Sequence, residues 1–232
     1  MTGRILLATF VMGSIAAAAS AADKRVEVGA SAGWTFSDGV SGTATDRFGN
    51  EFSRIDPKDS FSWNLRLGYM VSEKSEIGVL YGAQPTQLVV GVRTSTANVR
   101  EFELGDQSIH HYHGYYAYHF GENEKMKPYF LIGLGATQFG GITVNTAAVP
   151  VRNDGQQHSI GGNTKFSGTA ALGVKVFPSP GFGIRLESRW TPTYIKSDAA
   201  GYWCDPYWGC YTVGNAQYNN QFELSGGFVF RF

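Results

Sequence analysis

Four of the five histidines lie close together in the sequence, and imidazole nitrogens are common ligands of zinc. They are His110, His111, His113 and His119. On a β-strand, His111 and His113 would point to the same face, because side chains alternate from residue to residue. No carboxylate or cysteine accompanies them at a recognisable ligand spacing, so a metal site is the weaker hypothesis. We predict instead that the histidines pointing into the fold hydrogen-bond to carboxylates, and we expect no metal and no cofactor.

Ser108, His110 and Glu103 carry the three chemical groups of a catalytic triad. A serine nucleophile needs a histidine base, and an acid that orients the base, at one place in the fold. On a strand, Ser108 and His110 would share one face with Glu103 nearby, but no nucleophile motif surrounds the serine. We therefore expect no catalytic residues, and an enzymatic function stays an alternative.

Charged residues form a third pattern, because they occupy every second position of several segments that are otherwise apolar. The residues of this charged face are Glu27, Arg66, Glu76, Lys175, Arg185, Glu187, Arg189, Glu223 and Arg231. A period of two is typical of strands whose two faces meet different surroundings. The chemistry of these charges therefore depends on the architecture that brings their strands together.

The alternation divides the chain into eight strands. We expect them at residues 26–36, 61–71, 76–83, 111–120, 128–140, 165–176, 182–190 and 222–232. Segment 128–140 is apolar on both faces, so alternation alone does not fix its orientation. The residues that we expect on its outer face are Phe130, Ile132, Leu134 and Ala136.

The connections between these strands alternate in length. Short polar links are expected at 72–74, 121–127 and 178–181, and long polar loops at 37–59, 92–100, 143–163 and 197–215. Pro85 is expected to weaken the end of the third strand, since proline cannot donate to the ladder. An even number of strands with alternating short and long connections is typical of an outer-membrane barrel. The sequence therefore predicts an all-β fold, an eight-stranded antiparallel up-and-down transmembrane β-barrel.

The distribution of charge separates a membrane barrel from a soluble one such as a lipocalin, which also has about eight strands. A soluble barrel has an apolar core, in which every buried charge is costly unless it is paired. Nine charges on one face fit a wet or ion-paired lumen, with the apolar face turned to lipid. The aromatic residues that we expect in girdles at the membrane interfaces are Phe36, Phe61, Tyr69, Phe120, Trp190 and Phe232. A soluble barrel stays the alternative.

The first residues have the order of a secretory signal, with Arg4, an uncharged apolar run at 5–19 and small residues after it. We expect cleavage at Ala21 or Ala22. The expected division is a signal peptide at 1–22 and an outer-membrane β-barrel domain at 23–232. The chain has 19 basic and 19 acidic residues, so losing Arg4 gives 18 − 19 = −1, which argues against a nucleic-acid partner.

Cys204 and Cys210 lie close together in an aromatic segment before the last strand. An exported chain meets an oxidising compartment, so we predict a disulfide that closes a short loop, with two free thiols as the alternative. The aromatic residues that flank the pair are Tyr202, Trp203, Tyr207, Trp208 and Tyr211. Such residues anchor interfaces, so an extracellular partner is one hypothesis for this loop, and packing against neighbouring loops or lipopolysaccharide is the other.

The last five residues, Phe228-Val229-Phe230-Arg231-Phe232, resemble the terminal signature of outer-membrane barrels. This resemblance implies that Phe228, Phe230 and Phe232 form the signal read by the barrel-assembly machinery. Further similar segments are 76–81, 127–130, 133–137 and 183–187. Over most of its length the chain resembles the bacterial outer-membrane β-barrel domain family, the group around the OmpA-type membrane domain. We expect no peptidoglycan-binding domain, and the cysteine pair is similar to that of family members.

The resemblance implies a protein of the bacterial outer membrane, with both termini in the periplasm and with membrane lipid and lipopolysaccharide around it. We expect a monomer with a structural or surface-interaction role and without catalysis. Because about eight strands leave an interior just filled by side chains, we expect the lumen charges to form an ion-paired plug. A narrow channel for small solutes is the first alternative, and a lipid-modifying outer-membrane enzyme is the second.

Overall fold

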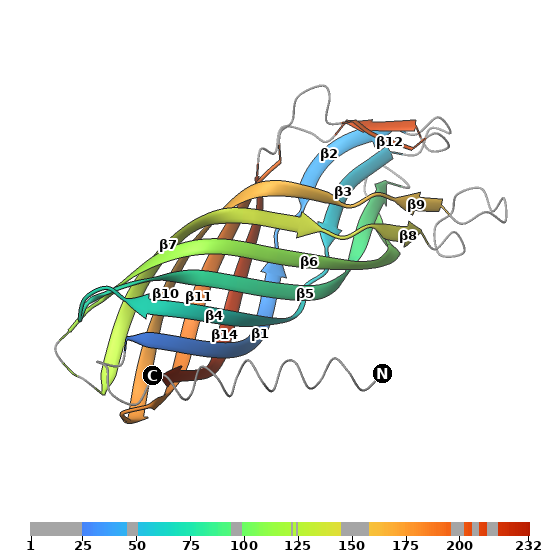
Figure 1. Cartoon of the computed structure of the whole chain (residues 1–232). Coiled ribbons are helices and arrows are strands. Elements are labelled where there is room, and N and C mark those ends of the chain that lie inside the picture. The colour runs from blue at the N-terminus through green and yellow to red at the C-terminus, as the bar shows by residue number, and fades with distance from the viewer. Residues whose placement is uncertain are drawn as a thin grey trace, which may run out of the picture.

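The computed structural model describes residues 25–45, 51–93, 99–121, 123, 125–144, 158–195, 202–205, 209–212 and 218–232. Within these ranges the chain consists of β-strands joined by turns (Figure 1). The strands are β1 (Val26–Ser37), β2 (Val40–Thr45), β3 (Glu51–Pro57), β4 (Ser60–Met70), β5 (Ser75–Arg93), β6 (Val99–His119), β7 (Met126–Phe139), β8 (Ile142–Val144), β9 (His158–Ile160), β10 (Asn163–Ser179), β11 (Phe182–Tyr194), β12 (Tyr202–Asp205), β13 (Gly209–Thr212) and β14 (Tyr218–Arg231). In the described ranges no helix has the length and apolar character needed to cross a membrane.

Eight of the strands close into an antiparallel barrel, in which each strand pairs with the next one along the chain. Their order around the barrel is β1, β4, β5, β6, β7, β10, β11 and β14, and β14 pairs with β1. At this seam Glu27 stands opposite Arg231, and the backbones of Val26 and Phe232 exchange hydrogen bonds of 3.2 and 2.8 Å. Closure pairs both backbone edges of every barrel strand. The predicted eight-stranded up-and-down barrel is confirmed.

Three short links join the barrel strands at one end, where the last residues of the chain also lie (Figure 1). Between β4 and β5, the Val71 amide donates to the Ser75 carbonyl at 2.8 Å, and the Ser75 amide donates to the Ser72 hydroxyl at 3.1 Å. Gly121 follows β6 with a φ of 82°, a left-handed conformation that glycine adopts without a steric penalty. These are the short links that the sequence predicts.

The opposite end is more ordered than the sequence indicates. The expectation of a continuous loop at 37–59 is wrong, because β2 and β3 form a hairpin there and β3 pairs with β5 from Leu88 onward. Likewise β8 pairs with β9, and β12 pairs with β13, within the expected long loops. The physical reason at 37–59 is that β5 continues past the end of β4, so its free backbone groups need partners, which β3 supplies.

Strand β5 runs through Pro85 without ending, as its 19 residues and the 21 residues of β6 show. Pro85 falls between the end of pairing with β4 at Ala83 and the start of pairing with β3 at Leu88. A residue without an N–H donor is tolerated where one side of the strand has no ladder partner. The predicted weakening at Pro85 is therefore limited to this gap.

The two faces of the barrel differ as the alternation predicts. Large apolar and aromatic side chains point outward, with Leu134 at 65% and Leu172 at 63% exposure among the most open. On β7 the outward row is the expected one, Phe130, Ile132, Leu134 and Ala136, opposite buried Tyr129 and Leu131. Charged and polar side chains are buried inside. One wall of the interior is apolar and comprises Leu80, Tyr115, Ala117, Tyr129, Leu131 and Ala171.

Candidate functional site

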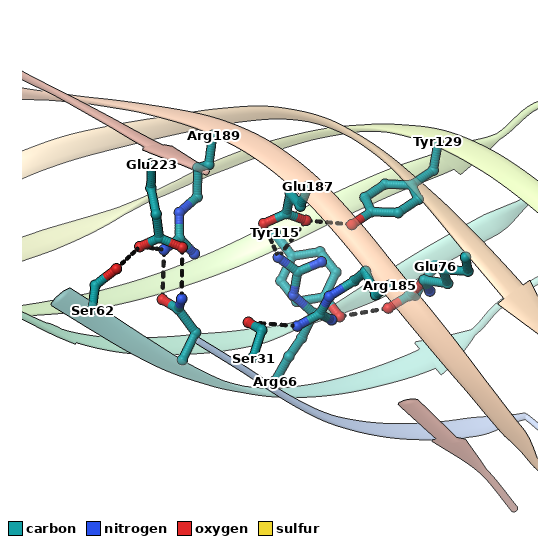
Figure 2. A network of polar contacts seen from close by, with 12 residues as sticks. Ser31, Ser62, Arg66, Glu76, Tyr115, Tyr129, Arg185, Glu187, Arg189 and Glu223 are labelled. Carbon is teal, nitrogen blue, oxygen red and sulfur yellow. Dashed lines mark hydrogen bonds and ion pairs between the residues drawn. The ribbon is translucent and has the colours of Figure 1, made fainter. Parts of the chain in front are cut away.

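The lumen collects the charged residues that the sequence places on one face of the strands. Eight of the nine are buried, and Arg231, near the end of β14, is 15% exposed at its side chain. They come from β1, β4, β5, β10, β11 and β14, and each ion pair joins two different strands. Figure 2 shows part of the resulting network of ion pairs and hydrogen bonds.

The Glu223 cluster consists of Glu223, Arg189, Asn64 and Ser62. Arg189 donates to the Glu223 carboxylate at 2.7 Å, Asn64 donates to it at 2.7 Å, and Ser62 at 2.9 Å. Arg189 also donates to the Asn64 side-chain carbonyl at 2.5 Å. Both oxygens of this buried carboxylate are therefore hydrogen-bonded by groups from β4 and β11 (Figure 2).

The Glu187 cluster consists of Glu187, Arg66 and Tyr129. The Arg66 guanidinium donates to both Glu187 oxygens at 2.8 Å, and the Tyr129 hydroxyl donates to the same carboxylate. The Arg66 guanidinium carbon lies 5.1 Å from the centre of the Tyr115 ring, within the range of a cation–π contact. This pair joins β4 to β11 through the middle of the lumen (Figure 2).

The Lys175 cluster consists of Lys175, Glu27, Glu76, Tyr115 and Arg231. The Lys175 ammonium binds the carboxylates of both Glu27 and Glu76, the latter at 2.6 Å. Tyr115 donates to Glu76 at 2.5 Å, and Arg231 donates to Glu27 at 2.5 Å. Lys175 thus bridges β1 and β5 from β10.

Arg185 is the exception among the lumen charges. It is 2% exposed, and its hydrogen bond to the Ser31 hydroxyl is 3.2 Å long. Among the described residues it forms no ion pair, and its Nε has no hydrogen-bond partner. The predicted network therefore contains Arg66, Glu76, Glu187, Arg189, Glu223 and Arg231 as paired members and Arg185 as an unpaired one.

The histidines lie on β6 but bond differently from the prediction. The prediction of carboxylate partners is wrong for His111 and His113, which bond the hydroxyls of Thr137 and Ser167, each at 2.9 Å. Those hydroxyls lie on β7, which pairs with β6, and on β10, the strand after β7 in the sheet, whereas the carboxylates are engaged by cations. His119 is 3.3 Å from Glu76. In the described part of the chain no group of three or more His, Cys, Asp or Glu is arranged to hold a metal ion.

The three residues of the hypothetical triad do not come together. Ser108 lies on the exposed outer face, and the ring of His110 bonds the Tyr81 hydroxyl at 2.9 Å and stacks on its ring. Glu103 lies beyond a bulge in β6 and forms an exposed ion pair with Lys58 at 2.8 Å. No nucleophile–base contact is formed by these groups.

Three further predictions concern the signal peptide, the cysteine pair and the aromatic residues at the end of β14. Residues 1–24, which include the expected signal peptide and its cleavage site at Ala21 or Ala22, lie outside the described residues. Cys204 and Cys210 stand opposite each other in the β12–β13 register, and their disulfide stays a prediction. Phe228 and Phe230 point outward from β14, and Phe232 ends the chain at the seam.

The sequence-based prediction missed the neutral members of the network. Tyr115, Tyr129 and Asn64 donate to buried carboxylates, yet none of them was expected to belong to the site. Side-chain alternation indicates their position, because Tyr115 and Asn64 alternate along their strands with outward residues just as the charged residues do.

Comparison with known proteins identifies the architecture. Residues 5–232 match the family model of the outer membrane protein beta-barrel domain. The neisserial surface protein A is similar in structure, with a TM-score of 0.52 and 15% identity over 89% of this chain and 97% of that one. The outer membrane protein OprG of Pseudomonas aeruginosa has a TM-score of 0.54 and 15% identity, over 90% and 97%. At such identities the likeness concerns the fold alone. No curated protein matches the sequence.

Proposed function

Because the chain belongs to the outer membrane protein beta-barrel domain family, we propose that it is a closed, non-catalytic barrel with a structural or surface-interaction role. It is a β-barrel of the bacterial outer membrane, and its apolar outer face meets the acyl chains of lipid and lipopolysaccharide. We propose that it acts as a monomer. The observation that carries the proposal is that ion pairs cross the lumen from Arg66 to Glu187 and from Lys175 to both Glu27 and Glu76.

The lumen contacts support a plug rather than a path. An eight-stranded barrel encloses a space that side chains alone can fill. The Glu223, Glu187 and Lys175 clusters occupy this space with carboxylates that are each bound by at least one cation, and three of the four also accept from a neutral donor. At the end opposite the short turns, Leu88, Val90, Ile109 and Ile142 are all buried, which indicates a second, apolar region. A solute would have to break buried ion pairs to pass.

The elements outside the barrel support a role in surface interaction. With the short turns and termini on the periplasmic side, the β2–β3 hairpin and the ends of β5 and β6 project from the cell. The aromatic segment around Cys204 and Cys210 lies in the same set of connections and is the proposed contact for an extracellular partner. We further propose that Phe228, Phe230 and Phe232 are read by the barrel-assembly machinery.

The folded wild-type barrel is expected to give no single-channel steps in a planar lipid bilayer, because its lumen is blocked by paired side chains. The matched variant is the double substitution Arg66→Ser and Glu187→Ser, which empties the middle of the lumen by removing both members of this ion pair. This variant is expected to conduct in small steps. A heat-dependent gel shift verifies that both preparations are folded. Reproducible steps from the wild type would favour the narrow channel instead.

Lipid A extracted from cells with and without the gene is expected to have the same acyl pattern by mass spectrometry. The reason is that Ser108, His110 and Glu103 do not converge, since His110 binds Tyr81 and Glu103 binds Lys58. A change in acyl number that disappears with Ser108→Ala would establish the lipid-modifying alternative.

A further inference from the structure

The ion pairs of the lumen leave one cation over. The carboxylates on the inner faces of the described barrel strands that take part in these pairs are Glu27, Glu76, Glu187 and Glu223. Glu223 is matched by Arg189 and Glu187 by Arg66. In the Lys175 cluster two carboxylates face two cations. With Arg185 included, five cations therefore stand against four carboxylates, a difference of 5 − 4 = +1.

Arg185 is buried as deeply as the paired cations of the lumen, but it lacks a carboxylate partner. Its Nη2 donates to the neutral Ser31 hydroxyl, and its Nε has no partner. Lys175 stands opposite it on β10, Arg66 repels it, and Glu187 attracts it without forming an ion pair with it. A buried ion without a counter-ion is strongly unfavourable, and an unsatisfied buried donor calls for a bound water or ion.

Two serines are neighbours of Arg185 in the register of the sheet. Arg185 stands opposite Gly227 of β14, and Gly227 stands opposite Ser31 of β1. Ser225 lies two residues before Gly227 on the same inner face, so it is a diagonal neighbour of Arg185. Its hydroxyl oxygen is buried and has no hydrogen-bond partner. Ser31 accepts a bond from Arg185, which leaves its own proton available.

Arg185, Ser31 and Ser225 together supply hydrogen-bond donors and one positive charge. Glu187 faces Ser225 from β11, but both of its oxygens are engaged by Arg66 and Tyr129. We propose that Arg185, Ser31 and Ser225 form a binding site for one small inorganic anion, such as chloride, in the lumen. The anion supplies the missing negative charge and receives the unused N–H and O–H donors. A packed eight-stranded interior restricts the ligand to this size.

Thermal unfolding of the wild type in detergent micelles tests the site. At equal ionic strength, sodium chloride or bromide is expected to raise the Tm by about 3–6 °C relative to sodium gluconate, whose anion is too large to enter. Arg185→Gln is expected to abolish the difference, and Ser225→Ala to reduce it with little change in fold. Lys58→Gln, which alters an exposed ion pair, is expected to keep the full difference.

Crystals grown in bromide give a direct readout, because an anomalous peak is expected in contact with the Arg185 guanidinium and the Ser225 hydroxyl. Equal wild-type Tm values in chloride and gluconate would overturn the proposal. So would an unchanged anion effect in Arg185→Gln, or in Ser225→Ala if the arginine variant does not fold. A bromide peak at another lumen residue would also contradict it.

Discussion

Replacing Lys175 with methionine is expected to lower the free energy of unfolding by about 3–5 kcal/mol, the range for buried pairs that lose one partner. Glu76 would keep only the Tyr115 hydroxyl as a strong donor, whereas Glu27 would keep Arg231. The loss should therefore fall mainly on Glu76. Urea unfolding of the barrel in detergent micelles or lipid vesicles, followed by tryptophan fluorescence, measures it.

Two variants control this experiment. Lys175→Met combined with Glu76→Gln removes the carboxylate charge that has lost its cation, and it should recover much of the lost stability. Lys58→Met breaks the exposed pair with Glu103 and should cost less than about 1 kcal/mol. If Lys175→Met is as stable as the wild type, the lumen is wet enough to hydrate its carboxylates, and the plug is wrong.

Leu172→Arg is expected to lower the free energy of unfolding by about 2–4 kcal/mol, the range for a cation on the lipid face near the membrane midplane. Leu172 points outward from the middle of β10, with Phe130 on β7 and Ser188 on β11 opposite it. Val71→Arg is the matched control, since Val71 is similarly exposed but lies at the short turn after β4. There the cost should fall to about 0–1 kcal/mol.

Both variants are measured by urea unfolding in lipid vesicles and again in detergent. The depth-dependent difference between positions 172 and 71 is expected in vesicles. An equal cost at the two positions would mean that the outer apolar face does not lie in the hydrocarbon layer.

Alternation predicted the barrel because one physical rule governs every spanning strand: successive side chains face lipid and lumen in turn. The row from Phe182 to Trp190 and the row from Phe222 to Phe230 follow this rule without exception, so their faces could be assigned from sequence. The β2–β3 hairpin could not be predicted in the same way. Its residues lie outside the barrel, and it forms because β5 extends past β4.

The partners within the lumen could not be assigned from sequence either. Arg66 and Glu187 are 121 residues apart, and they meet because strand tilt and stagger bring β4 and β11 face to face across the barrel. The same geometry places Arg185 opposite Gly227 on one side and Lys175 on the other, although in sequence it is as close to Glu187 as Arg189 is. Alternation shows which side chains enter the lumen, whereas the stagger of the strands determines which of them are paired.

The seam between β1 and β14 joins the first and the last strand of the barrel, with Val26 bonded to Phe232. Such a contact has the longest sequence separation available, which makes closure slow and late in folding. A nascent or truncated chain that lacks β14 has two unpaired backbone edges, one on β1 and one on β11, and neither is stable in hydrocarbon. Any catalyst of assembly must therefore shield both edges until β14 has paired with β1 and β11.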